Sequence, residues 1–131
     1  MLRKGKVDNK FNNIDEKKLH PYIIAKNKIK FLKIKNPKSQ IEAGTFYSEL
    51  TYIVKEFLEN QFFIKTIEMT TDEIKHNKKM IGFDNNGLNK IIKVLERADL
   101  IKFAKLFPSE NDINMDLTVV DQFLDNQKIN L

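Results

Sequence analysis

Apolar residues recur at three- and four-residue intervals along four separate stretches of this chain, at residues 22–32, 46–62, 88–106 and 113–124. This spacing gathers the apolar side chains on one face of an α-helix, whereas a half-buried strand would alternate at every second residue. The pattern therefore predicts an all-α fold, a small bundle of about five helices. A helix-turn-helix-like arrangement of part of the bundle is an alternative within this class.

The first predicted helix begins at Pro21, because a proline at the first helical position loses no hydrogen bond. It ends before Asn36, since the residue preceding Pro37 is disfavoured in a helix. Its apolar stripe consists of Tyr22, Ala25, Ile29 and Leu32. Lysines lie between these positions, and two interpretations fit such a basic amphipathic helix. It docks on the bundle, which we favour, or it lies on a membrane surface.

The second predicted helix carries the longest apolar stripe and should face the core over almost five turns. The members of the stripe are Phe46, Leu50, Ile53, Val54, Phe57, Leu58 and Phe62. Residues 38–44 form a connector that partly extends this helix. Residues 62–67 are rich in aromatic and β-branched types but too few for another helix, so we expect them to cross the core in extended form.

A capping motif marks the start of a short helix in the middle of the chain. Thr70 or Thr71 is the predicted N-cap, and Glu73 reaches back to it as in a capping box. The residues interpreted as structural in this motif are Glu68, Thr70, Thr71 and Glu73. The short helix should end near Lys79, and residues 82–87 should form a loop.

Two further helices follow from the apolar stripes nearest the C-terminus. In the first of them, the positions expected to face the core are Leu88, Ile91, Ile92, Leu95, Ala98, Phe103 and Leu106. In the last helix they are Ile113, Leu117, Val120 and Leu124. Ser109 and Asp112 are the expected cap of this last helix. Its other side is acidic and carries Glu110, Asp112, Asp116, Asp121 and Asp125.

Positive charge is concentrated at one end of the 131-residue chain, whose formal net charge is +5. Residues 1–38 hold 12 Lys and Arg against 3 Asp and Glu, whereas residues 39–131 hold 11 against 15. We therefore divide the chain into a basic flexible arm (1–18), a helical domain (19–126) and a tail (127–131). An anionic partner, either a membrane surface bound through residues 1–38 or a nucleic acid, would explain the asymmetry. A solvated tail would explain it equally well.

The sequence contains no recognisable catalytic, metal or cofactor motif. There is no cysteine, and the two histidines, His20 and His76, are far apart. The oxygen-rich run at residues 84–87 lacks the alternating ligands and the final glutamate of an EF-hand loop. Glu56 and Glu59 would share one helix face, but exposed glutamates on a helix are ordinary. We therefore expect a non-enzymatic protein without metal, cofactor or small-molecule substrate.

Residues 71–105 could also be drawn as a DNA-binding helix-turn-helix. The connection between the two helices is longer than the usual three or four residues, and the second helix does not begin with a basic or amide-rich face. Both features disfavour sequence-specific DNA binding. A helical nucleic-acid-binding module that uses the basic N-terminal arm stays the alternative function.

Three blocks of sequence carry a family resemblance: residues 46–59, residues 68–74, and residues 95–105 followed by Pro108. In this order they resemble the C-terminal cytosolic domain of BatD-like membrane proteins from aerotolerance (Bat) operons. The resemblance implies a protein-protein interaction module that works with a MoxR-type AAA+ ATPase and with von Willebrand factor A membrane proteins. It also implies a cytoplasmic location at the inner membrane, as part of a longer protein with one membrane span. No apolar run in this sequence approaches the roughly 18 residues of a span, so we expect this chain itself to be soluble.

Within these blocks, Tyr47, Arg97 and Phe103 are the candidate partner-binding residues, because aromatic and arginine side chains dominate the energetics of protein interfaces. The alternative for Arg97 and Asp99 is structural, as an intramolecular ion pair or as helix-surface contacts. We favour the structural interpretation for the polar residues.

Overall fold

The computed structural model describes residues 20–81 and 85–127, and all regular structure within these ranges is helical. It contains six α-helices, four of them long, which confirms the predicted all-α bundle. The long helices are α2 (Pro21–Ile34), α3 (Gln40–Phe62), α6 (Asn85–Phe103) and α7 (Glu110–Gln127). The short elements are the 3-10 helix η1 (Thr66–Glu68), α4 (Thr71–His76) and α5 (Lys78–Ile81).

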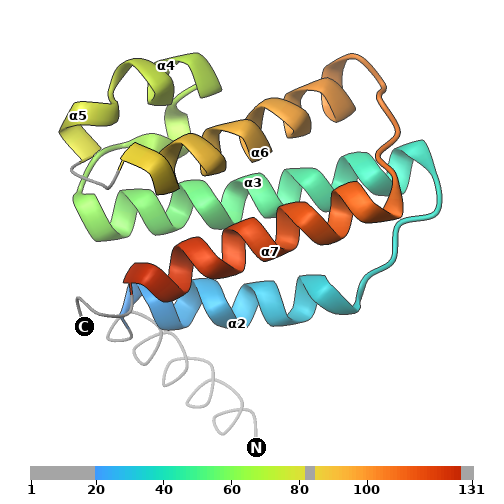
Figure 1. Cartoon of the computed structure of the whole chain (residues 1–131), viewed down its shortest axis with the longest axis horizontal. Coiled ribbons are helices and arrows are strands. Elements are labelled where there is room, and N and C mark those ends of the chain that lie inside the picture. The colour runs from blue at the N-terminus through green and yellow to red at the C-terminus, as the bar shows by residue number, and fades with distance from the viewer. Residues whose placement is uncertain (1–19, 82–84, 128–131) are drawn as a thin grey trace, which may run out of the picture.

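The four long helices form an antiparallel bundle in which consecutive long helices run in opposite directions (Figure 1). Helix α3 packs against both α2 and α6, and α7 packs against the same two helices. The elements α4 and α5 lie at the end of the bundle where α3 finishes and α6 starts, and α4 packs on α6 (Figure 1). Among the described residues, no long helix covers the outward side of α3 between α2 and α6.

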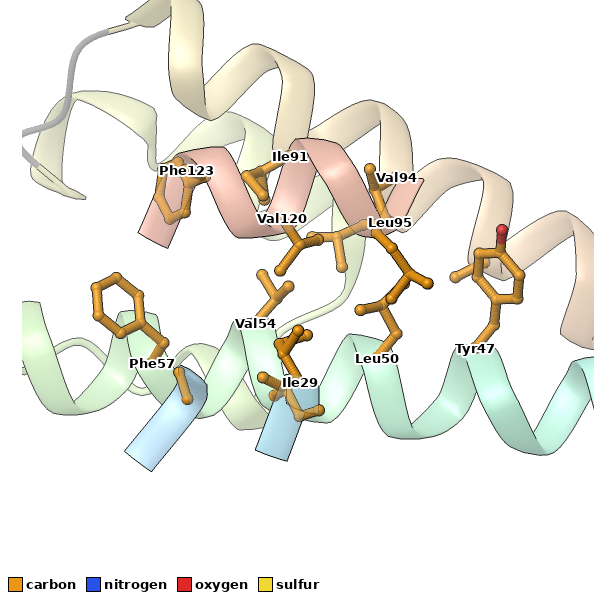
Figure 2. Close-up of a cluster of buried hydrophobic side chains, with 14 of the residues drawn as sticks. Ile29, Tyr47, Leu50, Val54, Phe57, Ile91, Val94, Leu95, Val120 and Phe123 are labelled. Atoms are coloured by element: carbon orange, nitrogen blue, oxygen red, sulfur yellow. The ribbon is translucent and has the colours of Figure 1, made fainter. Parts of the chain in front are cut away.

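Most residues of the predicted stripes lie in the core, where side chains of the four long helices meet along the bundle axis (Figure 2). Ala25, Ile29 and Leu32 are at most 2% exposed, so α2 docks on the bundle through the expected face. The four predicted core residues of α7 are all buried. Aromatic edge contacts strengthen the packing, as between Phe57 and Phe123, whose ring centroids are 6.0 Å apart.

The prediction that Phe103 and Leu106 face the core is wrong. Phe103 is 80% exposed and Leu106 is 41% exposed. Helix α6 ends at Phe103 because Lys105 adopts a left-handed conformation (φ 56°), and the amide of Leu106 then bonds back to the carbonyl of Leu100 at 3.2 Å. This helix-ending motif takes Leu106 out of the helical register, whereas Phe103 is the last helical residue and its side chain lies outside the core.

The expected extended crossing of the core by residues 62–67 is also wrong. Phe63 caps α3 in the left-handed region (φ 58°), and its side chain is 90% exposed. Thr66 is buried and donates its hydroxyl hydrogen to the carbonyl of Lys55 at 2.7 Å. The carboxylate of Glu59 accepts from the amide of Ile67 at 3.1 Å. These bonds fold the segment back along the end of α3 as a 3-10 turn.

The predicted cap of the short helix is confirmed with Thr70 as the N-cap. Its hydroxyl accepts from the amide of Glu73 at 3.1 Å, and the Glu73 carboxylate accepts from the Thr70 amide at 2.9 Å. The short helix divides into α4 and α5, and α6 already begins at Asn85, three residues earlier than expected from its apolar stripe. Because residues 77–84, including α5, separate α4 from α6, no short turn of helix-turn-helix type joins them.

Two other predicted boundaries shift. The connector expected at residues 38–44 is mostly helical, because Ser39 caps α3 by accepting from the amide of Glu42 at 3.1 Å. Gln127, assigned to the tail, is instead the buried last residue of α7. The predicted arm, residues 1–18, lies outside the described residues.

Candidate protein-interaction groove

An open groove of about 890 Å³ runs along the outward side of α3, between α2 and the C-terminal end of α6. Helix α3 supplies the floor, where the small residues Gly44, Thr45 and Ser48 lie. Helix α2 supplies one wall through Phe31, and α6 with the chain that follows it supplies the other. The groove is therefore the space that a fifth bundle helix would fill.

Large apolar side chains at the groove are exposed to solvent. Ile41 is 81% exposed, Phe31 is 69% exposed and Tyr52 is 47% exposed. Single exposed apolar residues are normal, but a group of them around one concave surface is typical of a binding site. A smaller cavity of about 390 Å³ shares Ile41 and continues toward the α2–α3 connection. Both hollows lie along one face of the first half of α3.

Gly44 lies on the floor of the groove, in the fifth position of α3. A glycine inside a helix costs about 1 kcal/mol relative to alanine. Apart from the adjoining backbone of α3 and the two chain neighbours of Gly44, no atom of the described chain lies within 4 Å of the position that a Cβ would take there. Packing inside the domain therefore gives no reason for glycine here.

The charges around the groove are balanced on the α2 side. Lys28 forms an ion pair with Glu56 at 2.7 Å, and its ammonium group lies 5.6 Å from the centre of the Tyr52 ring. Glu49 forms an ion pair with Lys35 at 3.0 Å.

The α6 side is positive. Lys102 contacts the ring of Phe103, and among the described residues neither Lys102 nor Lys105 forms an ion pair. The pKa of the Lys55 ammonium is lowered, first by burial and then by the positive charge of Lys102. The groove therefore presents uncompensated positive charge along one edge.

Tyr47, a predicted partner-binding residue, is fully buried and cannot contact a partner. Its side chain points from α3 into the bundle (Figure 2), and its hydroxyl donates to Asp116 Oδ2 at 2.6 Å. Burial, followed by the bond to Asp116, raises the pKa of Tyr47 far above its ordinary value. Burial also raises the pKa of Asp116, although Tyr47 and Arg97 oppose this shift.

Arg97 is held by the neighbouring helix rather than presented to a partner. Its Nε atom lies 2.8 Å from Asp116 Oδ2, and its Nη1 atom lies 3.4 Å from Asp112 Oδ1. The Nε–H bond is not aligned with the carboxylate, so the contact is an ion pair without a well-formed hydrogen bond. Because Asp116 is only 3% exposed, the acidic side predicted for α7 contains one carboxylate that faces inward.

The other predicted polar residues have structural roles or lie on the surface. Asp99 does not pair with Arg97; it accepts a hydrogen bond from the Thr71 hydroxyl at 2.7 Å and so ties α4 to α6. Glu68 is exposed at the end of η1. Of the three predicted partner-binding residues only Phe103 is well exposed, beside the groove residue Lys102.

The sequence analysis did not identify the groove residues, because they are far apart in the sequence and belong to no common motif or apolar stripe. Phe31 falls outside the apolar stripe of its helix, and Ile41 and Gly44 lie in the expected connector. One indication was nevertheless present: Ile41 is a large apolar residue that belongs to none of the predicted core stripes. Only the packing of three helices shows that these positions share one surface.

The lysines of α2 are largely neutralised within the bundle. Lys26 forms an ion pair with Asp121 at 2.7 Å, Lys33 pairs with the same carboxylate, and Lys28 pairs with Glu56. Of the four α2 lysines, only Lys30 forms no ion pair among the described residues, and Lys35, directly after α2, pairs with Glu49. This network leaves α2 little charge for an anionic surface. The nucleic-acid and membrane interpretations of the basic region therefore depend mainly on residues 1–18.

The described part of the chain contains no cluster of three or more potential metal ligands. Glu56 and Glu59, which share a face of α3, are engaged by Lys28 and by the amide of Ile67. No helix within residues 20–81 and 85–127 is both long and apolar enough to cross a membrane.

Fold and surface together define an antiparallel helical bundle with an open, partly apolar groove. No protein-family model, curated protein or solved structure matches this chain. The resemblance to BatD-like domains thus gains no support from these comparisons and stays a prediction.

Proposed function

We propose that this domain is a non-enzymatic protein-protein interaction module whose partner binds in the groove between α2 and α6. The observation that carries the proposal is the exposure of Phe31, Ile41 and Tyr52 around one concave surface. Removal of apolar surface from water favours association, and these three side chains expose large apolar surfaces. None of the three belongs to the buried core of the bundle, so their exposure is not a by-product of core packing.

The partner that we propose is the MoxR-type AAA+ ATPase, or the cytosolic segments of the von Willebrand factor A membrane proteins, encoded with BatD-like proteins. This proposal rests on the three resembling blocks, residues 46–59, 68–74 and 95–105. It would locate the domain at the cytosolic face of the inner membrane. The groove does not depend on this identification and can be tested separately from it.

A pull-down with the purified domain and each candidate partner from the source genome, with and without nucleotide, tests the proposal. The informative variant is Ile41→Glu. Ile41 is 81% exposed in the first turn of α3, where a carboxylate is favourable to the helix dipole, so the fold should persist. Met80→Glu is the matched control, because Met80 is 70% exposed on α5, outside the groove.

Capture of a candidate by the unmodified domain and by Met80→Glu, but not by Ile41→Glu, is the expected result. Equal capture by all three would remove the groove from the interaction. Capture of none of the candidates would refute the proposed partners.

A further inference from the structure

We infer that the groove receives an amphipathic helix of about three turns, with an apolar face on α3 and acidic residues along the edge that faces α6. The inference rests on the proposed function and specifies the chemistry of the partner segment. It uses three independent features of the surface: its length, its floor and its charge.

The length follows from the exposed face of α3. The two exposed large apolar residues of α3 at the groove are Ile41 and Tyr52, and at 1.5 Å per residue the span between them is about 16 Å, or three helical turns. Phe31 on one side and the end of α6 on the other leave a channel bounded by two helices. An amphipathic helix fits such a channel by placing apolar residues at i, i+3, i+4 and i+7 against the floor.

The floor allows close approach. Gly44 and Ser48 lie four residues apart, on the same face of α3, and a Cβ at Gly44 would meet no described atom beyond the adjoining backbone of α3 and its two chain neighbours. A helix that crosses here can bring its side chains onto the backbone of α3. The glycine, which costs about 1 kcal/mol in the free helix, is then explained by the occupant.

The positive charge on the α6 side of the groove indicates which kind of helix binds there. Lys102 and Lys105 line the α6 side without a described ion-pair partner, whereas Lys28 on the α2 side is paired with Glu56. Carboxylates on one edge of the bound helix would compensate the two lysines. The segment at residues 1–18 does not fit, because it carries six Lys and Arg against three Asp and Glu.

A second copy of this chain does not fit either. Helix α7 is its most acidic long helix, but the apolar stripe of α7 is buried in its own bundle. Met115 is its one large apolar residue that is well exposed among those described. We therefore commit to a different protein that supplies the acidic helix.

The test is a selection from a displayed library of helix-forming peptides, about 16 residues long, varied at the apolar stripe and at both edges. Peptides that bind the domain but not Ile41→Glu are kept. We expect them to share an apolar stripe and Asp or Glu along one edge. Selected peptides without carboxylates, or no peptide sensitive to Ile41→Glu, would overturn the inference.

Charge reversal then tests the role of the lysines. The double variant Lys102→Glu/Lys105→Glu should weaken binding of a selected acidic peptide about tenfold. Lys90→Glu/Lys93→Glu is the control, since it reverses two exposed lysines on α6 with the same spacing outside the groove. A peptide with lysines in place of its edge carboxylates should bind the first double variant better than it binds the unmodified domain. Equal affinity of the acidic peptide for both double variants would overturn the assignment of the acidic edge.

The inference and the proposed function can fail separately. If the pull-down depends on Ile41 but not on Lys102 and Lys105, the interaction module stands and the acidic helix is refuted. If no candidate protein is captured while acidic helical peptides bind, the proposed partners are refuted and the chemistry of the groove stands. Melting curves of each variant, compared with the unmodified domain, establish that the fold is retained.

Discussion

Replacing Tyr47 with phenylalanine isolates one buried hydrogen bond. The Tyr47 hydroxyl donates to Asp116 Oδ2 at 2.6 Å, and Asp116 is 3% exposed. A hydrogen bond to a charged group contributes about 1.5–3 kcal/mol, and its loss leaves the buried carboxylate with one donor fewer. The aromatic ring and its packing are kept. We therefore expect Tyr47→Phe to lower the free energy of unfolding by about 2 kcal/mol near neutral pH.

The assay is urea unfolding followed by far-ultraviolet circular dichroism, with Tyr52→Phe as the matched control. The Tyr52 side chain is 47% exposed and none of the described hydrogen bonds involves its hydroxyl, so this change should stay within about 0.5 kcal/mol. If both variants are equally stable, the bond to Asp116 makes no net contribution and the reasoning about this network is refuted.

The pH dependence of the same comparison gives a second check. Burial raises the pKa of Asp116, so this group becomes neutral at a pH above the ordinary carboxyl value of about 3.9. Loss of the Tyr47 hydroxyl removes one of the groups that oppose this rise. The destabilisation by Tyr47→Phe should therefore be largest where Asp116 is charged and should shrink on acidification. A difference that grows toward low pH would contradict the assignment of the charged acceptor.

Three further predictions concern the cap, the helix-helix ion pairs and the groove. Thr70→Ala removes the hydroxyl that accepts from the Glu73 amide, and it should cost about 1 kcal/mol in urea unfolding; unchanged stability would exclude a role for the cap. Partial burial raises the pKa of Asp121, but bonds from Lys26 and Lys33 outweigh burial and leave it below its ordinary value. The stabilisation by Asp121 is therefore complete above about pH 4 and is lost as the pH falls through the lowered pKa. The melting temperature of Asp121→Asn should consequently fall less on acidification than that of the unmodified domain. An equal fall in both proteins would contradict this assignment. Gly44→Ala should stabilise the free domain by about 1 kcal/mol and weaken binding of groove peptides, and a loss of stability would show that the Cβ position is not open.

The helices themselves were predictable because their signals are local. The burial of Ala25, Ile29 and Leu32 follows from their spacing, and the Thr70–Glu73 cap needs only four consecutive residues. Such features depend only on the helical geometry of residues that are close together in the sequence. The sequence therefore determined the fold class and most of the core.

Local patterns failed where helices end. Phe63 and Phe103 continue apolar stretches, yet both are exposed. Phe63 is itself the left-handed cap of α3, and Phe103 is the last residue of α6, just before left-handed Lys105. An apolar residue predicts burial only while the helical register lasts. The position of a helix end depends on backbone bonds to the preceding turn, and the apolar pattern does not report them.

Tertiary structure alone decided the candidate site. Tyr47 looked like a binding residue but points into the bundle, and Arg97 is bound by carboxylates of α7 rather than by Asp99. The groove instead joins Phe31 and Ile41 to Lys102, residues of three different helices. Periodicity tells which face of a helix is apolar, but the side chains that stay uncovered are determined by the number of neighbours that the other helices supply. Within the described residues, α2 and α6 flank α3, and the groove is the side of α3 that they leave open.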